Sequence, residues 1–165
     1  MHVDTQLEAA LRALDHWPRF RLRLFFEGIV VGILSGTVIS FFRWGLEMGT
    51  VWRQWIYANV LASGGVLLNL SWFGVLLAAA LLLWRLGIYE PNAGGSGIPQ
   101  VKGVILGAIR MRWLRILWVK LVGGIVGIGL GLSLGREGPS IQIGAVTAQG
   151  LSRALGRTRM EERYL

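Results

Sequence analysis

Two short segments rich in glycine and proline contain the residues of this sequence that could do chemistry. They are GGSGIP at residues 94–99 and GREGPS at residues 135–140. Serine, glycine and proline are typical of the start of a helix. The apolar stretch after the first segment is too short to cross a bilayer, which predicts a half-helix there. A helix N-terminus offers free N–H groups and a positive dipole end, so each segment is a candidate anion site, with the hydroxyl of Ser96 as an added donor.

The second segment also contains a carboxylate. Glu137 follows Arg136 and precedes Gly138, and a carboxylate is drawn to a helix N-terminus. It could occupy the position of an anion there until protonation releases it. Broken helices whose N-termini point at an anion recur in membrane transporters. Two such segments that meet inside the bilayer would therefore form a transport site.

A simpler interpretation stays open for each segment. The first could be a glycine-rich loop capped by serine, and the second a solvated loop at the membrane interface. Neither is a phosphate-binding loop, because no GK[ST] follows the glycines. The sequence has no cysteine, and His2 and His16 both lie in the polar N-terminal stretch. We find no carboxylate pair, Ser/His/Asp set or metal-ligand cluster, so we expect no enzyme activity, no cofactor and no metal.

The composition places these segments in a membrane protein. Of the 165 residues, 53% are apolar and 16% are charged, and the mean hydropathy is +0.54. Soluble domains have about 25% charged residues. A net charge of +8 could indicate nucleic-acid binding, but in a chain this apolar it is typical of basic cytoplasmic flanks. We expect an all-α polytopic membrane protein with no nucleic-acid partner.

Three apolar stretches, at residues 24–42, 66–86 and 114–134, predict membrane-spanning helices, since a crossing needs about 20 residues. A fourth, at residues 141–155, is shorter and more polar. It predicts a partial or broken helix that faces protein or an aqueous cavity. Residues 43–65 contain the aromatic side chains of a membrane interface, and part of them could extend the first helix as a long, tilted element.

The distribution of basic residues predicts the orientation. Residues 4–16 fit a short amphipathic helix at the membrane surface, ended by Pro18 and a cluster of arginines, although a disordered tail is the alternative. Lys and Arg are frequent in this flank, in the second loop and at the end of the sequence, and sparse in the first loop. The positive-inside rule then places both ends in the cytoplasm. We expect residues 1–22 to be a cytoplasmic flank and residues 23–165 a multi-pass domain of the cell membrane.

Glycines at every fourth position predict close helix packing. They occur in the first and third spans, as Gly28, Gly32 and Gly36, and as Gly123, Gly127, Gly131 and Gly135. Small residues at this spacing let helix backbones approach closely in a membrane. We assign these two glycine rows a packing role and no direct chemistry.

The two segments resemble the first two selectivity-filter motifs of the CLC family of chloride channels and chloride/proton exchangers. GSGIP at residues 95–99 and GREGP at residues 135–139 occur in the family's order, and flanks such as EPNAGG and KLVGGIVGIGLGLSL are also CLC-like. The resemblance implies broken and tilted helices that form the first part of an inverted-repeat architecture. It also implies ten anion-binding residues: Gly95, Ser96, Gly97, Ile98, Pro99, Gly135, Arg136, Glu137, Gly138 and Pro139.

The resemblance implies a role for several of these positions. The hydroxyl of Ser96 would donate to a central chloride, and the backbone N–H groups of Gly97 and Ile98 would lie nearby. Glu137 would be the external gating carboxylate and, in exchangers, would pass a proton to and from the outer solution. Gly138 would line the outer anion site. Serine at position 96, where nitrate-preferring members have proline, implies a preference for chloride.

The sequence also lacks parts of the family's pattern. A CLC membrane domain is more than twice this long. The third filter motif, of GxFxP type, is absent here, as are the late chloride-coordinating tyrosine, the internal proton glutamate and the helices of the family's homodimer interface. We therefore expect the N-terminal part of a chloride channel or H+/Cl- exchanger. The alternative is a non-transporting membrane subunit or remnant that needs a partner chain.

Overall fold

The structure, a computed structural model, describes the backbone of residues 2–62 and 64–156, and the side chains of residues 22, 25–62 and 64–156. The described backbone is helical, as predicted. Five α-helices, a π-helical turn (η1) and a 3-10 turn (η2) follow in the order α1 His2–Ile56, η1 Tyr57–Leu61, α2 Val66–Tyr89, η2 Pro91–Ala93, α3 Ile98–Ile105, α4 Trp113–Gly129 and α5 Glu137–Ala154.

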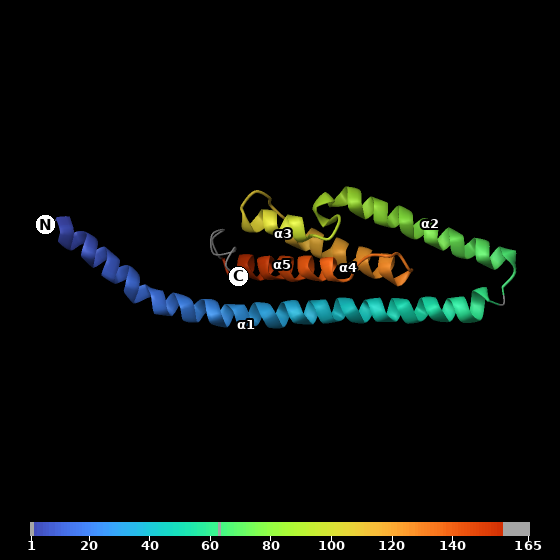
Figure 1. Ribbon diagram of the computed structural model, residues 1–165, viewed down its shortest axis with the longest axis horizontal. Helices are drawn as coiled ribbons and strands as arrows, with labels where there is room; N and C mark the ends of the chain where they lie inside the picture. The colour runs from blue at the N-terminus through green and yellow to red at the C-terminus, as the bar shows by residue number, and fades with distance from the viewer. Residues whose placement is uncertain (1, 63, 157–165) are drawn as a thin grey trace.

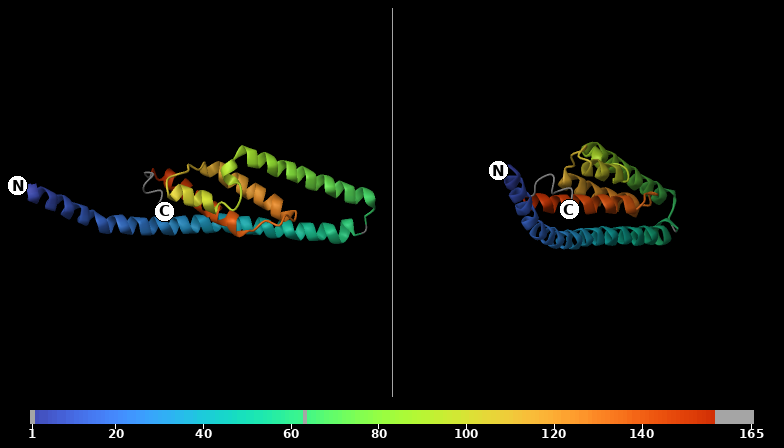
Figure 2. Two further views of the ribbon diagram at one scale, coloured as in Figure 1. Left: turned by 45° about the horizontal axis from the view of Figure 1, so that its top comes forward. Right: turned by 60° about the vertical axis from the view of Figure 1, so that its left-hand side comes forward.

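The helices form three layers. α4 and α5 lie between the long α1 on one side and α2 with α3 on the other (Figures 1 and 2). α1 packs against both α4 and α5, α2 packs against α4, and α3 packs against α5. α4 and α5 therefore form the centre of the molecule, and each of the other three α-helices packs against one or both of them.

The link from α1 to α2 and the link from α3 to α4 lie toward opposite sides of the molecule. In Figure 1 the start of α1, the link from α3 to α4 and the end of α5 lie toward the left, and the link from α1 to α2 lies at the right. This arrangement agrees with the predicted order of loops. The side of the membrane that each end faces stays a prediction.

Among the described residues, two helical segments are long and apolar enough to cross a membrane. They are Phe25–Leu61 and Val66–Tyr89, and they include two of the three predicted spans. The third was predicted over residues 114–134, but α4 ends at Gly129. Gly131 has a φ of +105°, and the N–H of Leu132 donates to the carbonyl of Gly127 at 3.0 Å. This is a glycine-based helix end, and it shortens α4 to 17 residues, a length of about 25 Å.

α1 is longer than predicted at its N-terminal side. It runs from His2 through Pro18 to Ile56, so the prediction that Pro18 ends a separate helix is wrong. A proline removes one helical hydrogen bond and can bend a helix without ending it, and Figure 1 shows a bend in the blue N-terminal part of α1. The amphipathic face predicted for residues 4–16 lies outside the described side chains. At the other end, the predicted extension into residues 43–65 is confirmed as far as Leu61.

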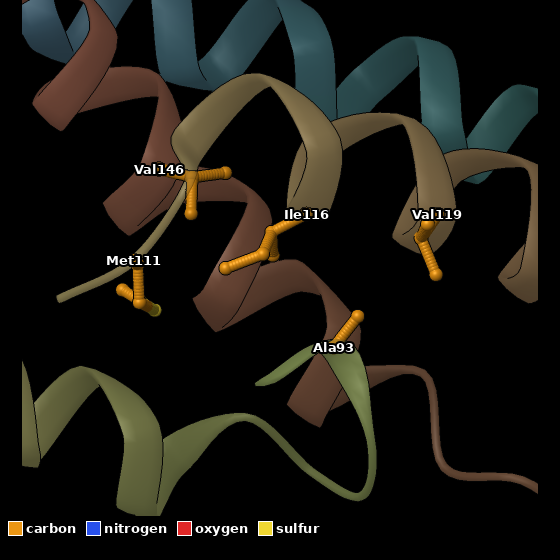
Figure 3. Close-up of a cluster of buried hydrophobic side chains, with 5 residues drawn as sticks. All are labelled: Ala93, Met111, Ile116, Val119 and Val146. Atoms are coloured by element: carbon orange, nitrogen blue, oxygen red, sulfur yellow. The ribbon is translucent and has the colours of Figure 1, made fainter. Parts of the chain in front are cut away.

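The buried core lies where α4 and α5 meet. Its largest cluster joins η2, the segment before α4, α4 and α5, and contains Ala93, Met111, Ile116, Val119 and Val146 (Figure 3). A second cluster ties α1 to α5 through Phe42, Leu46 and Ile143. α2 has no buried residue. The core therefore fixes the segment just before the first glycine-rich motif against α4 and α5.

The predicted glycine faces differ in what they contact. A Cβ atom added at Gly28, Gly32 or Gly36 would meet no atom within 4 Å, so the predicted packing on this face of α1 is absent from the described chain. On α4, Gly123 and Gly127 do face leucines of α2. A Cβ atom added at these positions would lie 3.6 and 3.4 Å from the nearest leucine side-chain atom of α2. Gly131 and Gly135 lie beyond the end of α4.

Candidate anion-binding site

The first motif is a tight turn between η2 and α3. Gly95 and Gly97 have φ values of +64° and +79°, a region that side chains rarely adopt and that glycine enters at no cost. Gly97 is the N-cap of α3, and a proline occupies the first turn of this eight-residue helix. The sequence thus predicted the half-helix correctly. Ser96 lies between the two glycines, directly before the helix N-terminus.

The second motif opens α5. Arg136 is the N-cap, Glu137 is the first helical residue, and Pro139 lies within the first turn, where a helix has no hydrogen-bond partner for the N–H that proline lacks. α5 has 18 residues, so it is longer than the half-length helix predicted over residues 141–155. The difference arises because the GREGPS motif itself enters the helix.

The two motifs touch at Gly138. A Cβ atom on Gly138 would lie 2.7 Å from the carbonyl oxygen and 2.8 Å from the Cα of Ser96. The views in Figures 1 and 2 show α3 and α5 starting side by side and running in the same direction. The structure therefore brings two helix N-termini together at one place.

A cavity of about 480 Å³ opens at this meeting point, between α2, α4 and the two motifs. Its wall includes half of the predicted anion-binding residues: Gly95, Ser96, Gly135, Gly138 and Pro139. The other five, Gly97, Ile98, Pro99, Arg136 and Glu137, do not line it among the described residues. The apolar part of the wall comes from side chains of α2 and α4 such as Leu83, Leu86 and Val119.

Arg136 and Glu137 lie at the surface. Both are exposed at the start of α5. Arg136 faces a second cavity, of about 560 Å³, whose wall also contains Glu47 and Arg53 of α1. The carboxylate predicted to compete with an anion is therefore one residue before the contact between Gly138 and Ser96, and it is open to its surroundings.

Lys120 supplies a positive charge to the first cavity. It lines the wall, only 6% of its surface is exposed, and its Nζ donates to the carbonyl oxygen of Gly95 at 2.8 Å. Sequence reasoning placed Lys120 in an apolar span but gave it no role. The signal was present, because an ionisable residue at membrane depth is expensive and marks a functional site.

Gln142 supports the same turn from α5. It is fully buried, and its Nε2 donates to the carbonyl of Asn92 at 2.8 Å. A Cβ atom on Gly97 would lie 2.6 Å from the Gln142 side chain, so only glycine fits there. The sequence reasoning missed this residue, because a glutamine inside a helix has no distinctive pattern.

The arrangement favours an anion. Lys120 is the only charged residue among the described residues that line the first cavity, and two helix N-termini add the positive ends of their dipoles. A low-dielectric wall strengthens such fields. The cavity has the chemistry of a site for a small anion.

Comparison with known proteins shows that the residues of this site fall within the sequence pattern of a known protein family. A model of the voltage gated chloride channel family matches residues 74–165, which is more than half of the chain and includes both motifs.

Individual relatives match a longer stretch. The chain is 34% identical over 132 residues to the H(+)/Cl(-) exchange transporter ClcA of Vibrio cholerae serotype O1, and the match covers 77% of this chain and 27% of the relative. It is 35% identical over 138 residues to ClcA of Salmonella schwarzengrund, with coverage of 81% and 28%. ClcA of Yersinia pseudotuberculosis is 32% identical over 134 residues, with coverage of 81% and 28%. The chain thus spans little more than a quarter of these relatives.

Proposed function

This chain belongs to the voltage-gated chloride channel (CLC) family, and we propose that it supplies the first two anion-binding motifs of a multi-pass membrane protein that transports chloride. The match of the family to residues 74–165 supports the assignment to this class. Because the chain spans little more than a quarter of the relatives it matches, the remaining motifs of the transport path would come from outside these residues.

One observation carries the proposal. The GSGIP and GREGP motifs, which are about 40 residues apart in the sequence, meet at Ser96 and Gly138 on the wall of one cavity that also contains the buried Lys120. Glycine at positions 95, 97 and 138 is needed for this approach, since two of them have positive φ and the third contacts Ser96 directly. Chloride at this point would meet the Ser96 hydroxyl, helix N-termini and a nearby ammonium group.

Glu137 would gate this path. It is the first residue of α5 and adjoins Gly138 at the cavity wall, and its carboxylate carries the charge that a helix N-terminus attracts. In its ionised form it would compete with chloride for the N-terminus, and its protonation would release the position. The relatives are named H(+)/Cl(-) exchange transporters, which favours coupling to protons over passive conduction.

The proposal includes the location, orientation and oligomeric state of the protein. We infer that it lies in the cell membrane with a cytoplasmic N-terminus, in accordance with the distribution of Lys and Arg. A homodimer is proposed for the complete protein, with chloride and, for exchange, a proton as the transported ions and no cofactor.

Chloride efflux from liposomes tests the proposal. In a chimera, this chain would replace the matching segment of the Vibrio cholerae ClcA, which supplies the other parts of the path. We expect chloride efflux above that of empty liposomes, with a proton flux in the opposite direction. Glu137→Gln should abolish the proton flux, because a neutral side chain cannot exchange a proton, whereas Glu47→Gln should preserve both fluxes.

Two results would contradict the proposal. A chimera that elutes as a folded protein but releases no chloride would show that this chain cannot form the filter, and would favour a non-transporting subunit. Proton flux that persists in Glu137→Gln would remove the proposed role of that carboxylate while leaving chloride transport intact.

A further inference from the structure

We propose that Lys120 is a positioning residue for the first motif. Its side chain holds the peptide between Gly95 and Ser96 in the orientation that binds an anion. The inference deepens the proposed function and rests on it, because it assigns the residue that prepares the Ser96 turn for chloride. It goes beyond the two glycine-rich motifs to a side chain on a different helix, 25 residues along the chain from Gly95.

The contact is close and sheltered. Nζ of Lys120 lies 2.8 Å from the carbonyl oxygen of Gly95, the length of a strong charge-assisted hydrogen bond. The side chain is 6% exposed, and within the described part of the chain the carbonyl of Gly95 is its hydrogen-bond partner. Burying an ammonium group costs free energy unless the group is hydrogen-bonded or paired. Here the hydrogen bond to the Gly95 carbonyl at the cavity wall offsets part of that cost.

This bond fixes the direction of a backbone donor. The carbonyl of Gly95 and the N–H of Ser96 belong to one peptide unit, and the described chain has no cis peptide bond. In a trans peptide the two groups point in opposite directions. Holding the Gly95 carbonyl against Lys120 therefore turns the Ser96 N–H away from α4.

The turn needs such a hydrogen bond to fix its backbone, because most of its residues are glycine. Gly94, Gly95 and Gly97 surround Ser96, and glycine peptides change orientation at little cost. Without a partner, the carbonyl oxygen of Gly95 would be free to present its negative partial charge to the cavity and repel an anion. Lys120 prevents this by binding the oxygen, and its own positive charge adds to the attraction for an anion.

Gln142 fixes the other end of the turn. Its Nε2 holds the carbonyl of Asn92 at 2.8 Å, and the side chain of Asn92 donates to the carboxylate of the buried Glu90 at 3.2 Å. This second hydrogen bond attaches Asn92, at the start of the turn, to α5, and it does not involve Gly95. Gln100 binds the carbonyl of the preceding Gly94 at 3.3 Å, and Gly138 contacts the backbone of Ser96. Among the described hydrogen bonds, the one from Lys120 is the only one made to the Gly95 carbonyl.

Chloride binding to the purified chimera with the Vibrio cholerae ClcA, in detergent and measured by isothermal titration calorimetry, is the first test. Lys120→Met keeps the length of the side chain but removes the charge and the donor, and we expect chloride to bind about tenfold more weakly. Lys120→Arg keeps both and should recover most of the affinity. Lys102→Met removes an exposed lysine of α3 that does not line the cavity, and this variant should bind chloride as the unchanged chimera does.

Hydrogen–deuterium exchange without chloride is the second test. In Lys120→Met the amides of Ser96 and Gly97 should exchange faster, and Lys120→Arg should restore slow exchange. Unchanged exchange together with unchanged chloride affinity in Lys120→Met would overturn the inference. If the unchanged chimera binds no chloride, the proposed function fails instead, and the exchange rates still decide whether Lys120 orients the turn.

Discussion

Gly138 is the residue at which the two glycine-rich motifs come into contact. Its missing side chain leaves room for the backbone of Ser96, whose carbonyl oxygen would be 2.7 Å from a Cβ atom at this position. Because the obstructing atoms belong to the backbone, no rotation of a side chain can relieve the overlap. The distance between the start of α5 and the turn before α3 is therefore set by a single glycine.

Gly138→Ala should separate the two motifs. The added methyl group meets the backbone of Ser96, so α5 must shift, and overpacking of this kind costs about 1–3 kcal/mol of stability. We expect chloride affinity to fall about tenfold or more in calorimetric titration, with a modest drop in Tm. Gly144→Ala, on the same helix, places a methyl at an ordinary 3.5 Å contact with Ile39 and should preserve affinity. Equal affinity in both variants would show that the contact is unimportant.

At the scale of elements, α1 and α4 approach each other closely through glycine. A Cβ atom on Gly49 would lie 2.9 Å from the Cα of Gly129, and one on Gly45 would lie 2.7 Å from the side chain of Ile125. Close backbone approach increases dispersion contacts, which hold membrane helices together where lipid is as apolar as the helices themselves. This contact fixes α4, and α4 in turn carries Lys120.

Gly49→Ala should destabilise the helix packing. The methyl group would overlap the α4 backbone, so we expect a loss of about 1–3 kcal/mol and a lower Tm in detergent. Gly28→Ala is the matched control, because a Cβ atom added at position 28 of α1 would contact no other side chain or helix within 4 Å. Alanine is the better helix former by about 0.5–1 kcal/mol, so the control should unfold at the same temperature or higher. A Tm that falls equally in both variants would contradict the proposed contact.

At the scale of the whole molecule, the outward surface is strongly apolar. α2 has no buried residue, and large side chains such as Leu67 and Trp52 are 83% and 72% exposed. In water such a surface would drive aggregation. Such a surface suits lipid or further helices of a membrane protein, and this agrees with two helices in the described chain that are long enough to cross a membrane.

Single cysteines can test the orientation of the whole molecule, because the sequence contains none. Ala62→Cys and Ala108→Cys introduce thiols at exposed positions in the first and second connections. If the N-terminus is cytoplasmic, a membrane-impermeant maleimide should label Ala62→Cys on intact cells and Ala108→Cys only after permeabilisation. The reverse pattern would place the N-terminus outside and overturn the assignment from basic residues.

Features with a local cause followed from the sequence. The continuous apolar run of residues 66–86 predicted α2, and the glycine, serine and proline of residues 94–99 predicted a turn followed by a short helix, because length, hydropathy and φ preferences act within one segment. Two other local rules gave the wrong helix ends. Pro18 does not end α1, and the glycine-based turn at Gly131 ends α4 earlier than its hydropathy indicated.

By itself, the sequence determined the helical membrane class and the positions of the two glycine-rich motifs, since both depend on residue types within short windows. Only the tertiary structure decided that Ser96 touches Gly138, that Lys120 binds the Gly95 carbonyl, and that Glu137 lies exposed beside the cavity. These relations join residues on different helices. They depend on how closely α3, α4 and α5 pack, and that distance is set by contacts that no single segment contains.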